Sequence, residues 1–94
     1  MEISDFNIGQ LVRSTKGRDK GRIFVIVRVL DDEYVLIADG DLRKIDKPKK
    51  KKIKHLAKIN VISEEIKEAL YNDKKINNAF IRKELERLGV NSRD

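Results

Sequence analysis

The sequence KGRDKGRIFVIVRVL, residues 16–30, decides the fold of this 94-residue chain. Residues 22–30 are rich in β-branched side chains and almost continuously apolar, which is typical of a strand buried on both faces of a small closed sheet. Residues 16–22 hold two glycines and four cations. Glycine permits a close backbone approach, and lysine and arginine supply charge. This connection therefore suits a polyanionic partner better than a protein core.

Four further strands are expected around this central one, at residues 8–14, 34–39, 42–46 and 53–62. The Asp39-Gly40 pair predicts a tight hairpin, so that Leu42 to Asp46 would run back antiparallel until Pro48 ends the pairing. Alternation in the last strand places one set of side chains on one face and Lys54 and Lys58 on the other. The first set is Ile53, His55, Ala57, Ile59 and Val61. Five short strands predict a small barrel or two packed sheets.

The hydrophobic period changes at Ser63, which is placed to cap a helix with acids in its first turn. A second helix is expected from Lys74 to Leu88, with Gly89 as its C-terminal stop. Both helices carry an apolar stripe that is interpreted as packing surface against the strands, with a docking site as the alternative. The stripes are Ile66, Ala69 and Leu70 in the first helix, and Ile76, Phe80, Ile81, Leu85 and Leu88 in the second. We thus predict a mainly β domain in residues 1–62 and a helical extension of two short helices in residues 63–94, packed on it.

Composition excludes several classes of function. There is no cysteine, which excludes disulfides and thiolate metal sites, and a single histidine argues against a zinc site. No nucleophile, base and orienting acid can be assembled, so we expect no enzyme and no cofactor. The start of the chain lacks signal-peptide features, and the longest apolar run, Ile23–Val27, is too short for a membrane span. A soluble, cytoplasmic protein is expected.

The net charge of +6 is concentrated in one interval of the chain. Residues 1–47 carry nine basic and nine acidic residues, and residues 63–94 carry seven of each. Residues 48–62 hold six lysines and no acid, and so account for the whole excess. Such concentration favours an anionic partner at one place on the surface, the alternative being a solvated loop.

Two runs carry a resemblance to a known family. GQLVRSTKGRDKGRIFVI, residues 9–26, resembles the KOW motif of large-subunit ribosomal proteins and of a transcription elongation factor. With DGDLRK (residues 39–44) and PKKKKIKHL (residues 48–56), the chain resembles the small KOW-domain RNA-binding proteins of bacteria, which are similar to archaeal and eukaryotic ribosomal proteins of the fourteen-e type. The resemblance covers about residues 7–60. It implies an SH3-like barrel that binds structured RNA, usually ribosomal, without enzymatic activity.

The candidate RNA contacts are the cations of two expected loops, the KOW loop at residues 16–22 and the lysine-rich loop that begins at Pro48, and of their neighbours. They are Lys16, Arg18, Lys20, Arg22, Arg43, Lys44, Lys49, Lys50, Lys51, Lys52, Lys54, His55 and Lys58. Consecutive lysines follow phosphates and do not read bases, so recognition of RNA shape is expected.

Several of these assignments have alternatives. Asp19 is expected to cap the turn or to orient Arg18 or Lys20. Arg43 either joins the RNA surface or pairs with Asp39 or Asp41. His55 is either a half-buried histidine or an RNA contact.

Three other functions compete with RNA binding by a monomer. The chain could be a protein-interaction module of the transcription or translation machinery, docking a ribosomal or transcription-factor partner through its barrel or its helical extension. Residues 48–54 also resemble a nuclear localisation signal, although short lysine runs match such signals often by chance. Attraction to acidic lipids is disfavoured because no apolar, aromatic-bearing helix lies beside the lysines. We expect no membrane partner.

Overall fold

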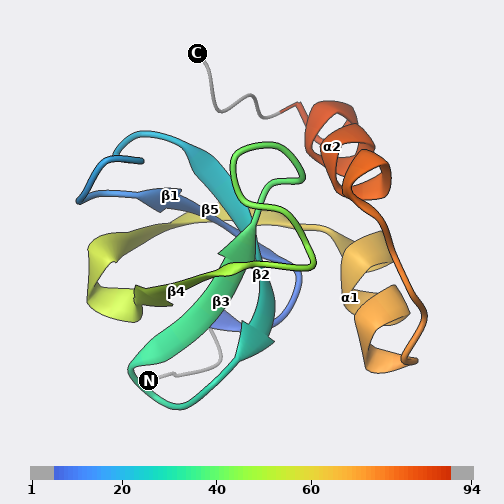
Figure 1. Ribbon diagram of the computed structural model, residues 1–94, viewed down its shortest axis with the longest axis horizontal. Coiled ribbons are helices and arrows are strands. Elements are labelled where there is room, and N and C mark those ends of the chain that lie inside the picture. The colour runs from blue at the N-terminus through green and yellow to red at the C-terminus, as the bar shows by residue number, and fades with distance from the viewer. Residues whose placement is uncertain (1–5, 90–94) are drawn as a thin grey trace.

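The central strand of the sheet is β2 (Ile23–Val29), formed by the apolar run. In the computed structural model, which describes residues 6–89, five antiparallel strands form one sheet in the order β4-β3-β2-β1-β5 (Figure 1). The remaining elements are β1 (Gln10–Ser14), β3 (Tyr34–Ala38), β4 (Lys49–Lys52), β5 (Leu56–Ile62), α1 (Glu64–Tyr71) and α2 (Asn78–Arg87). The mainly β fold with two C-terminal helices is confirmed. Closure of the strands into an SH3-like barrel stays a prediction.

β2 is buried on both faces, as its apolar run predicts, and its alternate side chains enter two separate clusters. Phe24 and Ile26 belong to the inner cluster, which lies on the face away from the helices. Its buried members are Val12, Phe24, Ile26, Val35, Ile37 and Leu56. The other face of β2 contributes to the helix-side cluster. That cluster comprises Leu11, Ile23, Val25, Val27, Ala38, Ile66, Ile81 and Leu85.

The two helices cover the helix-side cluster (Figure 1). Ser63 caps α1 as predicted, since its Oγ accepts a hydrogen bond from the Ile66 amide at 3.1 Å. Ile66 and Ile81 are fully buried, and Leu85 is 8% exposed. The two apolar stripes are therefore packing surface at these positions. Gly89 follows α2 with a positive φ of 78°, in agreement with its predicted role as a stop.

The predicted strand from Leu42 to Asp46 is wrong, because the fourth strand is the lysine run itself, β4. Residues 39–43 close a turn in which the Arg43 carbonyl accepts hydrogen bonds from the amides of Asp39 and Gly40. The Ile45 amide then donates to the Asn78 side chain of α2 at 2.8 Å. These backbone groups are satisfied by the turn and by α2, so the segment does not pair as a strand, and Pro48 precedes β4 instead of ending a hairpin.

Two predicted boundaries are also wrong. The expected strand 53–62 begins with a 3-10 turn, Ile53–His55, because the chain crosses here from β4 at one sheet edge to β5 at the other. The predicted shared face is broken, since Ile53 packs against the inner cluster while Ile59 and Val61 pack against the helix-side cluster. The second helix begins at Asn78, not at Lys74, because the Asn77 side chain accepts from the Phe80 amide and caps it there.

No helix among residues 6–89 combines the length and the apolar character needed to cross a membrane.

Candidate nucleic-acid interface

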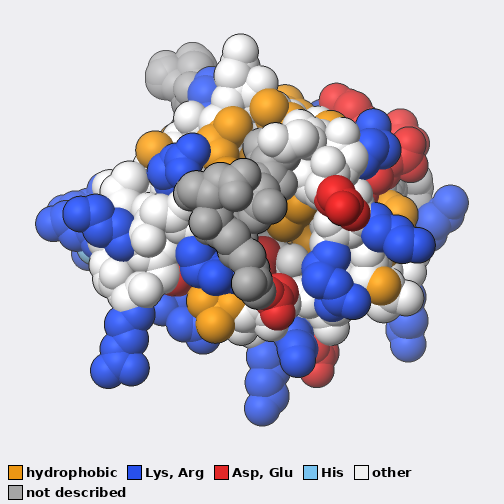
Figure 2. All heavy atoms as spheres, turned by 90° about the horizontal axis from the view of Figure 1, so that it is seen from above, with side chains coloured by type: hydrophobic (Ala, Val, Ile, Leu, Met, Phe, Trp, Pro, Cys, Tyr) orange, Lys and Arg blue, Asp and Glu red, His pale blue; other side chains and the backbone are white. Residues whose placement is uncertain are grey.

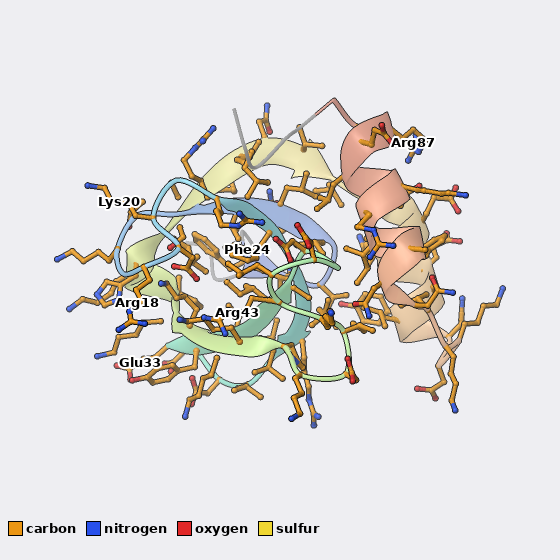
Figure 3. All side chains as sticks on the ribbon, turned by 45° about the horizontal axis from the view of Figure 1, so that its top comes forward. Arg18, Lys20, Phe24, Glu33, Arg43 and Arg87 are labelled. Carbon is orange, nitrogen blue, oxygen red and sulfur yellow. The ribbon has the colours of Figure 1, made fainter. Side chains whose placement is uncertain are left out.

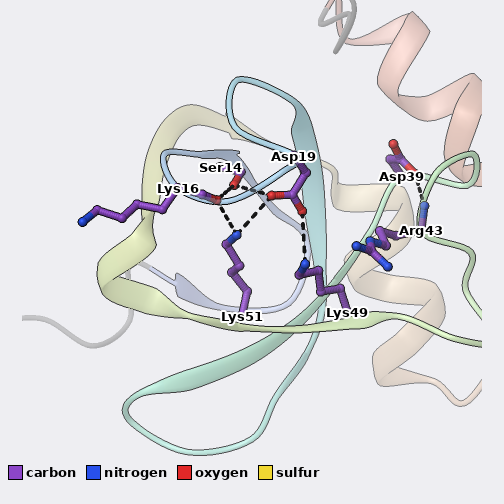
Figure 4. Close-up of polar contacts among 7 residues, drawn as sticks. All are labelled: Ser14, Lys16, Asp19, Asp39, Arg43, Lys49 and Lys51. Atoms are coloured by element: carbon purple, nitrogen blue, oxygen red, sulfur yellow. Dashed lines mark hydrogen bonds and ion pairs between the residues drawn. The ribbon is translucent and has the colours of Figure 1, made fainter.

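Asp19 holds the loop of residues 16–22, called the basic loop below, onto β4 (Figure 4). Its carboxylate is 1% exposed and accepts hydrogen bonds from Ser14 Oγ at 2.9 Å and from Lys51 Nζ at 3.1 Å. Lys49 Nζ lies 3.8 Å from the second oxygen, Oδ2. Lys51 Nζ also donates to the Lys16 carbonyl at 2.7 Å. Asp19 was expected to cap the turn or to orient Arg18 or Lys20; the hydrogen bonds that its carboxylate accepts come instead from side chains of β1 and β4.

The Asp19 cluster (Ser14, Asp19, Lys49 and Lys51) holds one carboxylate and two ammonium groups, so it keeps a net positive charge. Burial raises the pKa of Asp19, but the hydrogen bonds from Lys51 and Ser14 and the charges of Lys51 and Lys49 outweigh that effect and hold the pKa below its usual value. The carboxylate is therefore ionised at neutral pH. The positive charge of Lys51 is offset by the buried Asp19 carboxylate and does not face solvent.

The four lysines of β4 alternate between two directions. The register pairs Lys51 with Val35 and Lys49 with Ile37, so these two lysines share the inward face with the Asp19 cluster. Lys50 and Lys52 project outward beside Tyr34, with their Nζ atoms 4.6 and 5.7 Å from the centre of its ring. The lysine run is thus a strand, not the predicted loop, and only its alternate members face outward.

The two basic runs lie together at the end of the sheet away from the helices. The Thr15 amide donates to the His55 carbonyl at 2.9 Å, which fixes the basic loop beside the turn Ile53–His55. Arg18 and Lys20 point away from the body at this end, opposite α2 (Figure 3). Lysine and arginine side chains protrude there in Figure 2, whereas most of the acidic side chains seen in that view lie on the half that carries the helices. We call this surface the basic end; its exposed cations are Lys16, Arg18, Lys20, Lys50 and Lys54.

Glycine conformation shapes the basic loop. Gly17 and Gly21 have φ values of 92° and 91°, a region that favours glycine. The Gly21 amide donates to the Ser14 carbonyl at 2.8 Å, and a Cβ atom on Gly21 would meet nothing within 4 Å. Gly21 is thus required by the turn and leaves open space beside the loop.

Three other predicted contacts lie toward α2, beside the 39–43 turn. Arg22 is half-buried and forms ion pairs with Asp39 at 3.1 Å and Asp41 at 3.7 Å. Arg43 is half-buried as well, and Lys44 is exposed. Among the described residues, Arg43 and Asp39 are joined through the Arg43 backbone and not through its guanidinium: the Arg43 amide donates to Asp39 Oδ1 at 2.9 Å, and the Arg43 carbonyl accepts from the Asp39 amide.

Lys54, His55 and Lys58 were expected on one strand, but the structure places Lys54 and His55 in the 3-10 turn and Lys58 on β5. His55 is half-buried in the 3-10 turn, as one of its two interpretations requires. Loss of hydration and the nearby charges of Lys16, Lys54, Lys51 and Lys52 lower its pKa. Lys58 is exposed on β5, where it pairs with Val12, and it does not share a strand with Lys54.

Sequence reasoning missed two buried polar contacts. One is the hydrogen bond between Asp19 and Lys51. It could have been predicted only from the side-chain alternation of β4, and residues 49–52 were expected to form a loop. The other links the helices, since Ser63 Oγ donates to Glu84 Oε1 at 2.9 Å and Arg87 donates to both oxygens of Glu84. Hydrogen bonds from Arg87 lower the pKa of Glu84. Burial raises this pKa, whereas the Ser63 hydroxyl and the charge of Arg87 lower it further.

Across residues 6–89 no group of three or more histidine, cysteine or acidic side chains could hold a metal ion.

Fold and charge together define a small β protein with a concentrated cationic surface at one end. No protein-family model matches the chain. It is 32% identical over 73 residues to the "Putative ribosome-binding protein YbzG" of Bacillus subtilis (strain 168), an alignment that covers 78% of this chain and 99% of that protein. The chain belongs to the family of that protein.

Proposed function

We propose that this protein binds structured ribosomal RNA through its basic end, without enzymatic activity. The observation that carries the proposal is that the basic loop, β4 and the turn Ile53–His55 meet at one end of the sheet. The relative from Bacillus subtilis is named for ribosome binding, which agrees with this partner.

The finer family assignment is part of the proposal. We infer that residues 1–62 form a KOW-type domain of the fourteen-e ribosomal class. Two features support it: a basic loop with two glycines at positive φ enters the central strand, and a lysine-bearing strand lies beside that loop. On this basis the protein acts as a cytoplasmic monomer that needs no cofactor.

The chemistry of the basic end suits phosphates better than bases. Lysine and arginine neutralise phosphates and release their counterions, which supplies affinity without reading sequence. Base stacking needs an open aromatic face, but the ring of Tyr34 has Lys50 and Lys52 over it. The proposal is therefore recognition of RNA by the placement of its phosphates.

Co-sedimentation with ribosomes across a salt series tests this proposal. The test variant is Lys50→Glu with Lys52→Glu, which reverses the outward charges of β4 and leaves the Asp19 contacts in place. The control is Lys67→Glu with Lys83→Glu, an equal charge change on α1 and α2 at positions that do not line the hollow between the two helices. We expect the test variant to leave the ribosome at lower salt, with the slope of log affinity against log salt reduced by roughly 0.7–0.9 per lost contact.

The proposal fails if the test variant and the control lose ribosome binding equally, because bulk charge alone would then explain the loss. It also fails if the native protein does not associate with ribosomes while it is folded.

A second function is favoured by a groove between the helices. Its lining includes Glu65, Ala69, Ile76 and Phe80, and Tyr71 nearby is 60% exposed. A protein partner of the transcription or translation machinery would dock here. Ile81 and Leu85 cannot test this alternative, because both are buried in the helix-side cluster. Tyr71→Ala is the suitable variant: a loss of ribosome association with RNA binding intact would favour docking of a protein.

A further inference from the structure

We propose that Arg43 and Lys49 form a subsite for one phosphate of the RNA backbone. This inference rests on the proposed function and adds a specific contact to it. The subsite lies between the basic end and α2, where cations outnumber the acidic side chains that could pair with them.

Charge pairing beside the inner cluster leaves one cation unpaired and another weakly paired. Lys51 pairs with Asp19 at 3.1 Å, and Arg22 lies 3.1 Å from Asp39 and 3.7 Å from Asp41. Lys49 is held only loosely, with its Nζ 3.8 Å from an oxygen of Asp19 that has no hydrogen-bond partner among the described residues. Arg43 is the cation without an ion pair among the described residues. The four cations Arg22, Arg43, Lys49 and Lys51 thus face three acids, Asp19, Asp39 and Asp41, and one positive charge has no counter-charge.

Arg43 is the stronger indication of a ligand. Its side chain forms no hydrogen bond or ion pair with any residue between 6 and 89, and its Nε is buried without a partner. Buried donors are normally satisfied, so an unpartnered guanidinium nitrogen calls for an acceptor from outside the chain. The planar fork of a guanidinium matches the oxygens of a phosphate, which can accept two parallel hydrogen bonds.

The backbone places the two cations at the same end of β3. Lys49 pairs with Ile37, and the Arg43 carbonyl accepts from the Asp39 amide at 2.9 Å. Ile37 and Asp39 are two residues apart, roughly 7 Å along the chain. In Figure 4 the Arg43 guanidinium extends toward the ammonium group of Lys49. A single phosphate between them would receive hydrogen bonds from both.

The subsite is tested first with inorganic phosphate as the probe, in an NMR titration of the native protein. We expect the guanidinium resonances of Arg43 to shift, while those of Arg28, which is exposed on β2, stay in place. An Arg43 signal that moves no more than that of Arg28 would overturn the proposal.

Ribosome binding of Arg43→Lys then separates RNA from a small anion as the source of the phosphate. The substitution keeps the charge and removes the fork, so we expect affinity to fall about tenfold. Lys44→Ala removes a neighbouring exposed charge and should cost less than this. The thermal midpoints of both variants check that they fold.

Two results would overturn the assignment to RNA. In the first, Arg43→Lys binds ribosomes as the native protein does although inorganic phosphate shifts Arg43; the pair would then be a small-anion site. In the second, Lys44→Ala lowers the affinity for ribosomes as much as Arg43→Lys does, and general charge attraction would then explain both losses. If Lys50→Glu with Lys52→Glu still abolishes binding in either case, the proposed function stands and only the subsite fails.

Discussion

The two faces of the sheet are covered in different ways. α1 and α2 cover the helix-side cluster with apolar side chains, among them Ile66 and Ile81. The basic loop lies beside the other side of the sheet and is attached by charge, through Asp19 and Lys51. The apolar side chains that form the first cover are buried by it and cannot contact a partner. A cover attached through one buried acid leaves Lys16, Arg18 and Lys20 of the basic loop exposed to solvent, and the proposed RNA contacts are at this end.

Removing apolar packing should have the largest effect on stability. Ile81→Ala leaves a cavity under α2, and we expect a loss of about 2–5 kcal/mol in the free energy of unfolding, measured with urea. Ile62→Ala, at a position that is 45% exposed, is the control and should cost much less. Equal losses for the two variants would show that the helices do not cover a true core.

Breaking the Asp19 cluster should have the next largest effect. Asp19→Asn leaves the ammonium group of Lys51, whose side chain is 8% exposed, without its counter-charge. We expect a loss of about 2–3 kcal/mol in urea unfolding. Adding Lys51→Met should recover part of this loss, because the unpaired charge is then gone. If the double variant is as unstable as the sum of the single variants, the two residues are not coupled.

These two covers also show what the sequence could predict. Apolar periodicity predicted β2, both helices and the burial of Ile66, Ile81 and Leu85, because a buried face of a helix or strand requires apolar residues at regular spacing. The lysine run carries no apolar residue, so nothing in it indicated a strand, and β4 forms because β3 offers a free edge for pairing. The basic residues of the site were predictable from charge. Their division into inward and outward members was not, since it depends on the strand alternation of β4.

Acid should loosen both covers, in a direction set by the pKa values. Asp19 and Glu84 have lowered pKa values in the folded protein, so their contribution to stability is present above the unfolded value, about 4, and is lost as the pH falls through the folded value. We expect the free energy of unfolding to fall below about pH 4. Asp19→Asn should flatten this dependence without abolishing it, because Glu84 remains. An unchanged slope in that variant would contradict the assigned role of Asp19.

A smaller effect is expected at the junction of the two helices. Ser63→Ala removes both the cap of α1 and the hydrogen bond to Glu84, and should cost about 1–2 kcal/mol in urea unfolding. Ser63→Thr retains the hydroxyl and serves as the control. A loss in the threonine variant as large as in the alanine variant would indicate that side-chain size at this buried position matters more than its hydrogen bonds.

The central claim is that the basic end faces ribosomal RNA and the helices do not. It is tested most directly by placing a photo-crosslinking side chain either at Arg18, in the exposed basic loop, or at Tyr71, at the end of α1. With ribosomes present, the account predicts crosslinks to ribosomal RNA from position 18 and none from position 71. Crosslinks to RNA or to a ribosomal protein from position 71, with none from position 18, would contradict it.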